Sequence, residues 1–265
     1  MRELVDGSTA MVRGALAAGC DFFAGYPITP ASPILMSMMR ELPKVGGVAI
    51  QGEDEISSIG MCIGATMAGA RAMTATSAPG ISLYSENVGL AIMGEVPLVI
   101  IDVQRLGPAT GGATTVSQGD VQFVRWGTGG GYPVIVLAPS SIVECYQLTM
   151  RAFDLAERFR CPVFVLTDKE LNLTLGTVEV DAFVDHPVRE RDRRWRGDGD
   201  TAVPTFAVDT PRSTDCPARD VFECPPCNYA VGGVPGWICV PMTRDRAQSL
   251  EASGFYLAGT DLACD

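Results

Sequence analysis

The chain has 265 residues, of which 47% are hydrophobic and only 19% are charged, so it carries ample apolar surface for a packed core. Its formal net charge of −11 and its pI near 4.6 argue against a nucleic acid or an anionic membrane as a partner. The sequence contains no apolar run approaching the roughly 20 residues that span a bilayer, and its first residues lack the pattern of a signal peptide. We therefore expect a cytoplasmic protein.

Predicted strands and helices alternate along the first 175 residues. The strands are expected over residues 21–27, 46–50, 71–77, 97–104, 133–139 and 161–168, and the helices over residues 8–19, 31–43, 53–70, 82–95 and 140–159. The run PLVIIDVQ at 97–104 is almost wholly apolar, which is typical of a strand covered on both faces of its sheet. This alternation predicts an α/β fold with a parallel sheet and right-handed crossovers.

The composition changes near residue 185, where a dense run of mixed charges without periodicity begins. We expect a folded domain over residues 1–180, a charged linker over residues 181–211 and an atypical tail, rich in cysteine and proline, over residues 212–265. The tail has few apolar periods. It is interpreted as a truncated or altered second domain, or as the product of a shifted reading frame.

Five of the nine cysteines lie in this tail, at positions 216, 224, 227, 239 and 264. The CPPC pair at 224–227, together with Cys216 and Cys239, could bind zinc or iron through four thiolates. The flanking spacings contain no second CxxC pair, so we predict no metal site. An independent metal-binding module is the weaker alternative.

Several common catalytic signatures are missing from the expected domain. The chain's one histidine, His186, lies in the linker, which disfavours catalytic triads and histidine acid–base chemistry in the domain. The sequence has no Walker lysine loop and no GxGxxG after a strand, so it supports neither an NTPase nor a dinucleotide-binding domain.

Polar residues do occur where predicted strands end, which is where open α/β sheets bind ligands. Thr29 follows the first strand, and Pro27 and Pro30 stiffen the backbone around its hydroxyl. The turn TATSAPG at 74–80 and Arg105 follow two later strands. The guanidinium of Arg105 suits a carboxylate substrate through bidentate bonding, and a structural ion pair is the alternative.

Three consecutive acids open the helix expected at residue 53. Glu53 and Asp54 are interpreted as complementing the positive end of the helix dipole. Glu55 is followed by the almost uncharged run ISSIGMCIGA, so it enters an apolar layer. A carboxyl placed in this way can hold or pass a proton near neutrality.

Four motifs carry a resemblance to a known family. The segments GYPITPASPI, QGEDEISSIGMCIGATMAGARAMTATSAPG, VPLVIIDVQRLGPATG and QGDVQFVRWG together resemble the alpha, pyrimidine-binding subunit of 2-oxoacid:ferredoxin oxidoreductases. The resemblance covers roughly residues 5–175, and the 2-oxoglutarate type is the most similar.

The resemblance implies a thiamine diphosphate-binding domain of the pyrimidine type, with the cofactor shared between two subunits. Glu55 then matches the glutamate that hydrogen-bonds the aminopyrimidine ring and promotes formation of the reactive carbanion, and Thr76 and Ser77 line the cofactor cleft. Thr29 matches the threonine that contacts the 2-oxoacid, and Arg105 matches the arginine that neutralises its carboxylate.

The partners are implied in the same way. A beta subunit is expected to hold the diphosphate, Mg²⁺ and an iron–sulfur cluster, so this chain would be active only in a hetero-oligomer. The reaction would be oxidative decarboxylation of a 2-oxoacid to an acyl-CoA, with ferredoxin as the electron acceptor. The alternative is a non-catalytic binding or assembly subunit with a degenerate C-terminal half.

One departure from the family pattern and one decoy motif bear on this interpretation. Leu106 and Ala109 stand where relatives have glycine and serine, so 2-oxoglutarate, pyruvate and a branched 2-oxoacid all stay open as substrates. The GDG at 197–199 resembles the magnesium–diphosphate motif of thiamine enzymes. It follows RERDRRWR, which cannot form a buried strand, and it is therefore interpreted as a decoy.

Overall fold

The computed structural model describes residues 1–129, 132 and 134–190, together with four two-residue strands beyond residue 220. The chain divides into two compact units, Met1–Arg191 and Asp192–Asp265. In the second unit, β9 (Val221–Phe222) pairs with β11 (Met242–Thr243), and β10 (Ala230–Val231) pairs with β12 (Leu257–Ala258), both antiparallel. The GDG and CPPC segments lie outside the described residues.

A six-stranded parallel sheet forms the centre of the first unit. Its strands are β2 (Phe22–Gly25), β3 (Val48–Gln51), β4 (Ala72–Thr76), β5 (Leu98–Gln104), β6 (Ile135–Leu137) and β7 (Val163–Asp168). They lie in the order β3-β2-β4-β5-β7-β6, and each neighbouring pair is parallel. The predicted parallel α/β sheet is therefore confirmed. A separate antiparallel pair joins β1 (Arg2–Val5) to β8 (Gly176–Glu179).

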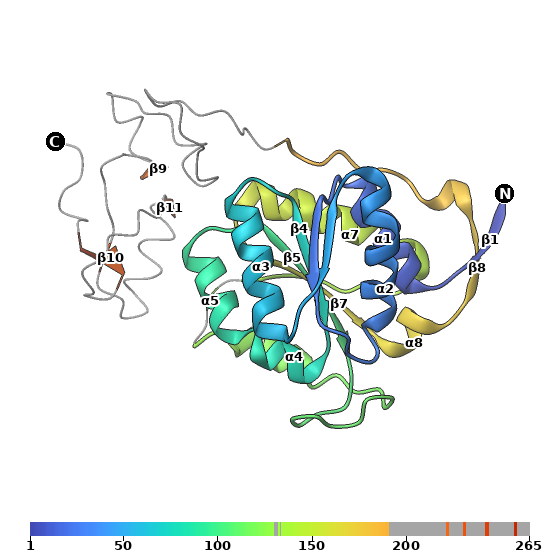
Figure 1. Cartoon of the computed structure of the whole chain (residues 1–265), viewed down its shortest axis with the longest axis horizontal. Helices are drawn as coiled ribbons and strands as arrows, with labels where there is room; N and C mark the ends of the chain where they lie inside the picture. The colour runs from blue at the N-terminus through green and yellow to red at the C-terminus, as the bar shows by residue number, and fades with distance from the viewer. Residues whose placement is uncertain are drawn as a thin grey trace. The chain divides into compact units, whose positions relative to one another are not determined.

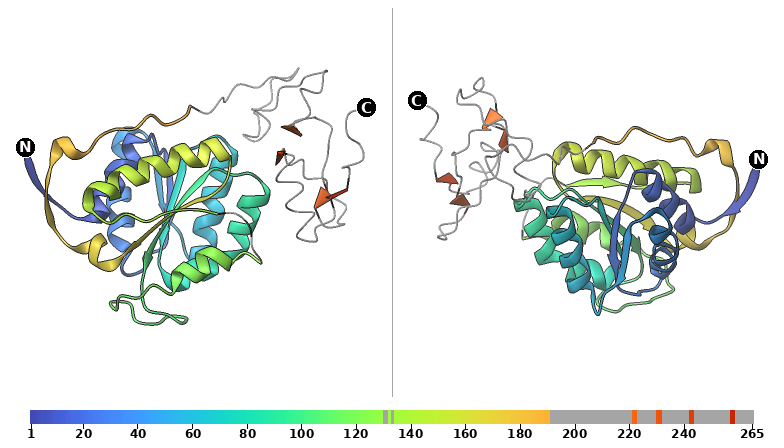
Figure 2. Two further views of the ribbon diagram at one scale, coloured as in Figure 1. Left: turned by 180° about the vertical axis from the view of Figure 1, so that it is seen from behind. Right: turned by 45° about the horizontal axis from the view of Figure 1, so that its top comes forward.

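Helices cover both faces of this sheet (Figures 1 and 2). They are α1 (Gly7–Ala17), α2 (Ser32–Glu41), α3 (Glu55–Met67), α4 (Ala78–Leu83), α5 (Ser85–Met93), α6 (Asp120–Trp126), α7 (Ile142–Phe159) and α8 (Lys169–Leu173), with two 3-10 turns, η1 (Leu42–Val45) and η2 (Val180–Ala182). Figure 1 shows α3 and α5 on one side of the sheet and α1 and α2 on the other, and α7 packs into the same apolar layer as α1 and α2.

The core consists of two apolar layers, one on each face of the sheet. Strand β5 supplies both, because Val99 and Ile101 pack into the layer of α1 and α7 while Leu98 and Ile100 pack into the opposite layer. All seven residues of β5 are buried. This two-sided burial explains why its sequence is a continuous apolar run rather than an alternating one.

The elements that follow the strands gather at one end of the sheet. Helix α4 begins directly after β4, the segment 105–119 follows β5, and α8 follows β7. In Figure 1 the labels α4 and α8 and the green segment after β5 all lie toward the lower end of the view. This is the carboxyl edge, where the predicted site residues were expected to meet.

Residues 183–190 run back along the outside of α7 in an extended conformation. The Tyr146 hydroxyl donates to Asp185, and the Arg189 N–H donates to Asp154 Oδ1 at 3.3 Å. The Arg71 guanidinium donates to the Arg189 carbonyl at 2.6 Å. The first ten residues of the expected linker thus pack on the sheet domain, and the division at residues 180 and 211 stays a prediction.

In the part of the chain that the structure describes, no helix is both long enough and apolar enough to cross a membrane.

Candidate functional site

Glu55 is the first residue of α3, and its side chain is buried, with 8% of its surface exposed. The neighbouring acid Asp54 has a different task. Its Oδ1 accepts the Ser57 N–H at 2.6 Å while Ser57 Oγ accepts the Asp54 N–H at 3.3 Å, which closes a capping box. These bonds lower the pKa of Asp54. Because Asp54 satisfies the helix start, the Glu55 carboxyl is not required for capping.

Glu55 and Thr76 meet beside Gly80, which brings together α3, β4 and α4. A Cβ atom at Gly80 would lie 1.9 Å from Thr76 Oγ1 and 2.9 Å from Glu55 Cγ. Only a glycine leaves room for this approach, since a Cβ atom does not come within 3.0 Å of heavy atoms to which it is not bonded. The structure therefore places two of the predicted cofactor-binding residues next to each other.

Hydroxyl groups surround this meeting point. Thr74 Oγ1 and the Tyr84 hydroxyl are hydrogen-bonded at 2.7 Å, and both residues are fully buried. Burial raises the pKa of Tyr84 above its usual range, so the phenol stays protonated. Within the described residues, Thr76 Oγ1 and Ser77 Oγ are buried and have no hydrogen-bond partner. Two buried hydroxyls are thus available to a ligand.

Arg105 and Thr29 are also brought together, through the backbone rather than through the threonine hydroxyl. Arg105 NH1 donates to the Thr29 carbonyl at 2.5 Å, and NH2 donates to the Thr110 carbonyl at 2.9 Å. Arg105 is 4% exposed, and its Nε has no partner in the described part of the chain. Both acceptors are uncharged, so a carboxylate ligand would be a suitable counter-ion.

Sequence reasoning missed two acids at this edge, Asp102 and Asp120. Asp102 lies within β5, opposite Thr76 in the sheet register, and is fully buried. Neither of its oxygens has a hydrogen-bond partner among the described residues. Burial, and after it the charge of Asp120, raise the pKa of Asp102 well above its ordinary value. An acid inside an otherwise apolar strand was the signal that could have revealed it.

Other unpartnered polar atoms lie at the same carboxyl edge. Gln104 Oε1 at the end of β5, Thr167 Oγ1 in β7 and Asn172 Oδ1 in α8 are buried without a hydrogen-bond partner in the described part of the chain. Buried polar groups are paired in more than about nine cases in ten, so this concentration at one edge requires an explanation. A polar ligand or ordered water at the strand ends supplies one.

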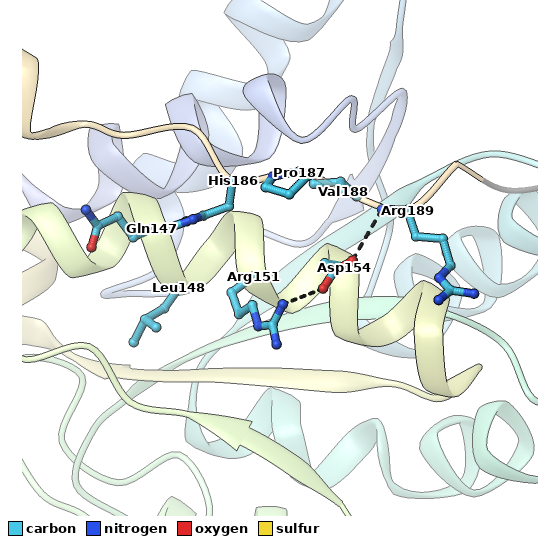
Figure 3. A pocket seen from close by; sticks show the side chains of 8 residues that line it. All are labelled: Gln147, Leu148, Arg151, Asp154, His186, Pro187, Val188 and Arg189. Atoms are coloured by element: carbon cyan, nitrogen blue, oxygen red, sulfur yellow. Dashed lines mark hydrogen bonds and ion pairs between the residues drawn. The ribbon is translucent and has the colours of Figure 1, made fainter.

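A separate pocket of about 550 Å³ lies between α7 and the extended segment (Figure 3). Its lining consists of Gln147, Leu148, Arg151, Asp154, His186, Pro187, Val188 and Arg189. Figure 3 shows Arg151 pointing to Asp154, and the two side chains form an ion pair of 2.6 Å. None of the predicted site residues lines this pocket, so it is distinct from the strand-end site.

Residues 13–208 match the family described as "Pyruvate flavodoxin/ferredoxin oxidoreductase, thiamine diP-bdg". The chain belongs to this family. The resemblance predicted from the four motifs is thereby confirmed, and so is the fold class.

Two curated relatives and one solved structure extend the comparison. The chain is 56% identical over 167 residues to 2-oxoglutarate synthase subunit KorA of Methanocaldococcus jannaschii, covering 63% of this chain and 46% of that protein. It is 49% identical over 170 residues to ketoisovalerate oxidoreductase subunit VorB of Methanothermobacter thermautotrophicus, covering 64% and 48%. The structure of 2-oxoglutarate:ferredoxin oxidoreductase from Magnetococcus marinus, with 2-oxoglutarate, coenzyme A and succinyl-CoA bound, aligns with a TM-score of 0.68 at 38% identity. That alignment covers 75% of this chain and 34% of the other.

The chain spans about half the length of the curated relatives it matches. The family match, over residues 13–208, includes all six strands of the sheet, β2 to β7.

The strand-end residues suit the pyrimidine half of thiamine diphosphate, the cofactor named in the family description. An aminopyrimidine offers ring nitrogens as acceptors and an amino group as a donor. Carboxyl and hydroxyl groups can pair with both. Glu55 and Thr76 provide such groups beside Gly80, and the buried hydroxyl of Ser77 follows directly in the chain.

Proposed function

We propose that the chain is the alpha-type subunit of a 2-oxoacid:ferredoxin oxidoreductase and that it binds the pyrimidine half of thiamine diphosphate. The observation that carries the proposal is the buried meeting of Glu55 and Thr76 across Gly80 at the carboxyl edge of the sheet, in a chain that belongs to this family. The adjoining Arg105 and Thr29 supply the substrate side of the same edge.

Glu55 is assigned the catalytic role in this proposal. Its carboxyl holds a proton and presents it to a ring nitrogen of the aminopyrimidine, while Thr76 and Ser77 bind the same ring through their unpartnered hydroxyls. When bound, thiamine diphosphate supplies the nucleophilic carbon and the electron sink for decarboxylation. The chain's own contribution is to orient the ring and to control the position of one proton.

Arg105 and Thr29 are assigned to the 2-oxoacid. The Arg105 guanidinium keeps an unpartnered Nε–H and donates its other hydrogen bonds to uncharged carbonyls, and it binds the substrate carboxylate. The exposed Thr29 side chain, next to the carbonyl that Arg105 holds, orients the keto group. Because the Thr29 backbone is held before substrate arrives, little ordering is required on binding.

The proposed substrate is 2-oxoglutarate. The four relatives named 2-oxoglutarate synthase subunit are 53–57% identical to this chain, the two named for ketoisovalerate are 46–49% identical, and one named 2-oxoglutarate oxidoreductase subunit is 41% identical. The proposed reaction oxidatively decarboxylates 2-oxoglutarate and transfers the acyl group to coenzyme A, giving carbon dioxide and reduced ferredoxin. A beta subunit would bind the diphosphate, Mg²⁺ and an iron–sulfur cluster.

Co-expression of the full chain with its partner subunit tests this proposal. With thiamine diphosphate, Mg²⁺, coenzyme A and an oxidised viologen, the complex should reduce the dye fastest with 2-oxoglutarate and more slowly with pyruvate or 3-methyl-2-oxobutanoate. Thr29→Val should raise the KM for 2-oxoglutarate by about tenfold, because one hydroxyl contact is lost. A stable complex that turns over no 2-oxoacid would contradict the proposal and favour the non-catalytic subunit.

A further inference from the structure

The motif QGDVQFVRWG is part of the family resemblance, yet none of the roles assigned above uses it. Its acid, Asp120, is the first residue of α6 and is 6% exposed. We propose that Asp120 is a positioning residue that fastens the cofactor-lining turn after β4 to the substrate-binding Arg105 after β5. The cofactor and substrate named here rest on the proposed function, whereas the link that Asp120 makes between the two segments does not.

One oxygen of Asp120 joins two segments that leave the sheet. Asp120 Oδ2 accepts the Ala78 N–H at 3.2 Å and the Arg105 N–H at 3.4 Å. Ala78 is the first residue of α4, whose N-terminal N–H groups lack partners within the helix. Ser77, at the N-cap position, makes no side-chain cap. A carboxylate from another helix therefore takes the place of the missing cap.

The connection continues from Arg105 to the Thr29 loop. The Arg105 backbone is held by Asp120, and its guanidinium donates to the Thr29 and Thr110 carbonyls. A movement of the Arg105 backbone would therefore change the orientation of its guanidinium. Three of the four predicted site segments, those around residues 29, 77 and 105, are linked through this single carboxylate and this single arginine.

Asp120 is suited to act as a charged acceptor. Burial raises its pKa, but the N–H groups of Arg105 and Ala78 and the Arg105 charge oppose that increase. Its neighbour Asp102 has no hydrogen-bond donor in the described residues. Of the Asp102 and Asp120 side chains, only that of Asp120 accepts hydrogen bonds from N–H groups in the described residues. We therefore place the negative charge on Asp120. A hydrogen bond to a charged acceptor is roughly twice as strong as one to a neutral acceptor.

Amide hydrogen exchange of the full chain in complex with its partner subunit tests the fastening directly. We expect exchange at Ala78 and Arg105 to be about tenfold faster in Asp120→Ala and about threefold faster in Asp120→Asn, which keeps a weaker, neutral acceptor. Glu144→Gln is the matched control, because Glu144 accepts the Ser140 N–H at 2.7 Å in the first turn of α7. It should leave exchange at Ala78 and Arg105 unchanged.

The kinetic readout is the KM for 2-oxoglutarate. It should rise by about tenfold in Asp120→Ala and by less in Asp120→Asn. The change in kcat should be smaller than the change in KM, because the orientation of the Arg105 guanidinium governs substrate binding. Faster exchange at the two amides with an unchanged KM would overturn the positioning role. Wild-type exchange at both amides in Asp120→Ala would overturn the fastening itself.

Two outcomes separate this inference from other failures. If Asp120→Ala does not fold, Asp120→Asn decides: faster exchange confined to Ala78 and Arg105 supports the inference, and wild-type exchange at both overturns it. If the wild-type complex turns over no 2-oxoacid, the proposed function fails, but the exchange measurement still decides the fastening because it requires no turnover.

Discussion

Adjacent residues of the same chemical type have different surroundings at the start of α3. Asp54 is partly exposed and caps the helix through Ser57, whereas Glu55 is buried against Thr76 and Gly80. Glu53, the first of the three acids, is exposed. Position relative to the start of the helix, rather than the carboxyl itself, decides which acid is available for chemistry.

Asp102 makes the stability of the chain depend on pH. Burial raises the pKa of Asp102 in the folded state, so the folded chain retains a proton that the unfolded chain has released. The free energy of unfolding should therefore fall as the pH rises above the ordinary aspartate pKa. We expect Asp102→Asn, which cannot ionise, to flatten this dependence and to be more stable than wild type under alkaline conditions.

Chemical denaturation across a pH series measures this effect. Glu144→Gln serves as a control, because hydrogen bonds lower the pKa of Glu144 and its contribution to stability is lost only on acidification. An Asp102→Asn chain with the same alkaline loss of stability as wild type would show that another group carries the proton.

Short elements determine the shape of the site. Helix α4 has six residues and places Gly80 over Thr76, and the segment after β5 returns on itself so that Leu106 pairs with Gly112. Neither element contains an extended apolar pattern. Their positions follow from contacts with the sheet and with Arg105.

Gly80→Ala should destabilise the domain by about 1–3 kcal/mol, because its Cβ would collide with the Thr76 hydroxyl. The same change at Gly89, in the interior of α5, meets no atom within 4 Å. Gly89→Ala should be neutral or stabilising by about 0.5–1 kcal/mol, because alanine favours helix. Denaturant unfolding of both variants checks this, and equal effects would refute the close packing at Gly80.

Gly111→Ala should disturb substrate binding. Gly111 has φ +52°, and an added Cβ would lie 1.7 Å from the Leu106 carbonyl, so the loop that presents the Thr110 carbonyl to Arg105 must shift. We expect the KM for 2-oxoglutarate to rise by about tenfold. Gly107→Ala, in the same loop but with open space around it, should leave KM within about twofold. Matching KM values for the two variants would contradict this account of the loop.

The longer elements could be predicted from the sequence because their apolar periods reflect burial against the sheet. Strand β5 and helices α3 and α7 are of this kind, and the alternation of strands and helices was sufficient for the fold. Helix α4 could not be predicted, since its first turn contains Pro79 and Gly80 and reads as a turn. Asp120 could not be recognised either, because its two hydrogen-bond donors are 42 and 15 residues away.

The site residues illustrate the same limit. Glu55, Thr76 and Arg105 could be selected because each follows or precedes an apolar run at a strand or helix end. Their mutual contacts could not, because those depend on Gly80 and on backbone carbonyls that have no signature in the sequence. The assignment of these residues to cofactor and substrate stays a prediction.

The first of the two compact units contains both core layers and the whole candidate site. We therefore expect a fragment of residues 1–191 to fold alone. It should unfold cooperatively, with a Tm within a few degrees of the main transition of the full chain. Calorimetry of both chains checks this. A fragment without a cooperative transition would show that the second unit is required for the fold of the first.

The assignment of the whole chain to an oxidoreductase depends above all on Glu55. The measurement that tests it most directly is 2-oxoglutarate-dependent viologen reduction by the full chain in complex with its partner subunit, for wild type, Glu55→Gln and Asp54→Asn. The two variants make the same chemical change at neighbouring positions, and asparagine still caps a helix. We expect a loss of about 100-fold or more in kcat for Glu55→Gln, because the catalytic carboxyl is removed, with Asp54→Asn near wild type. Equal activity in Glu55→Gln and wild type would contradict it.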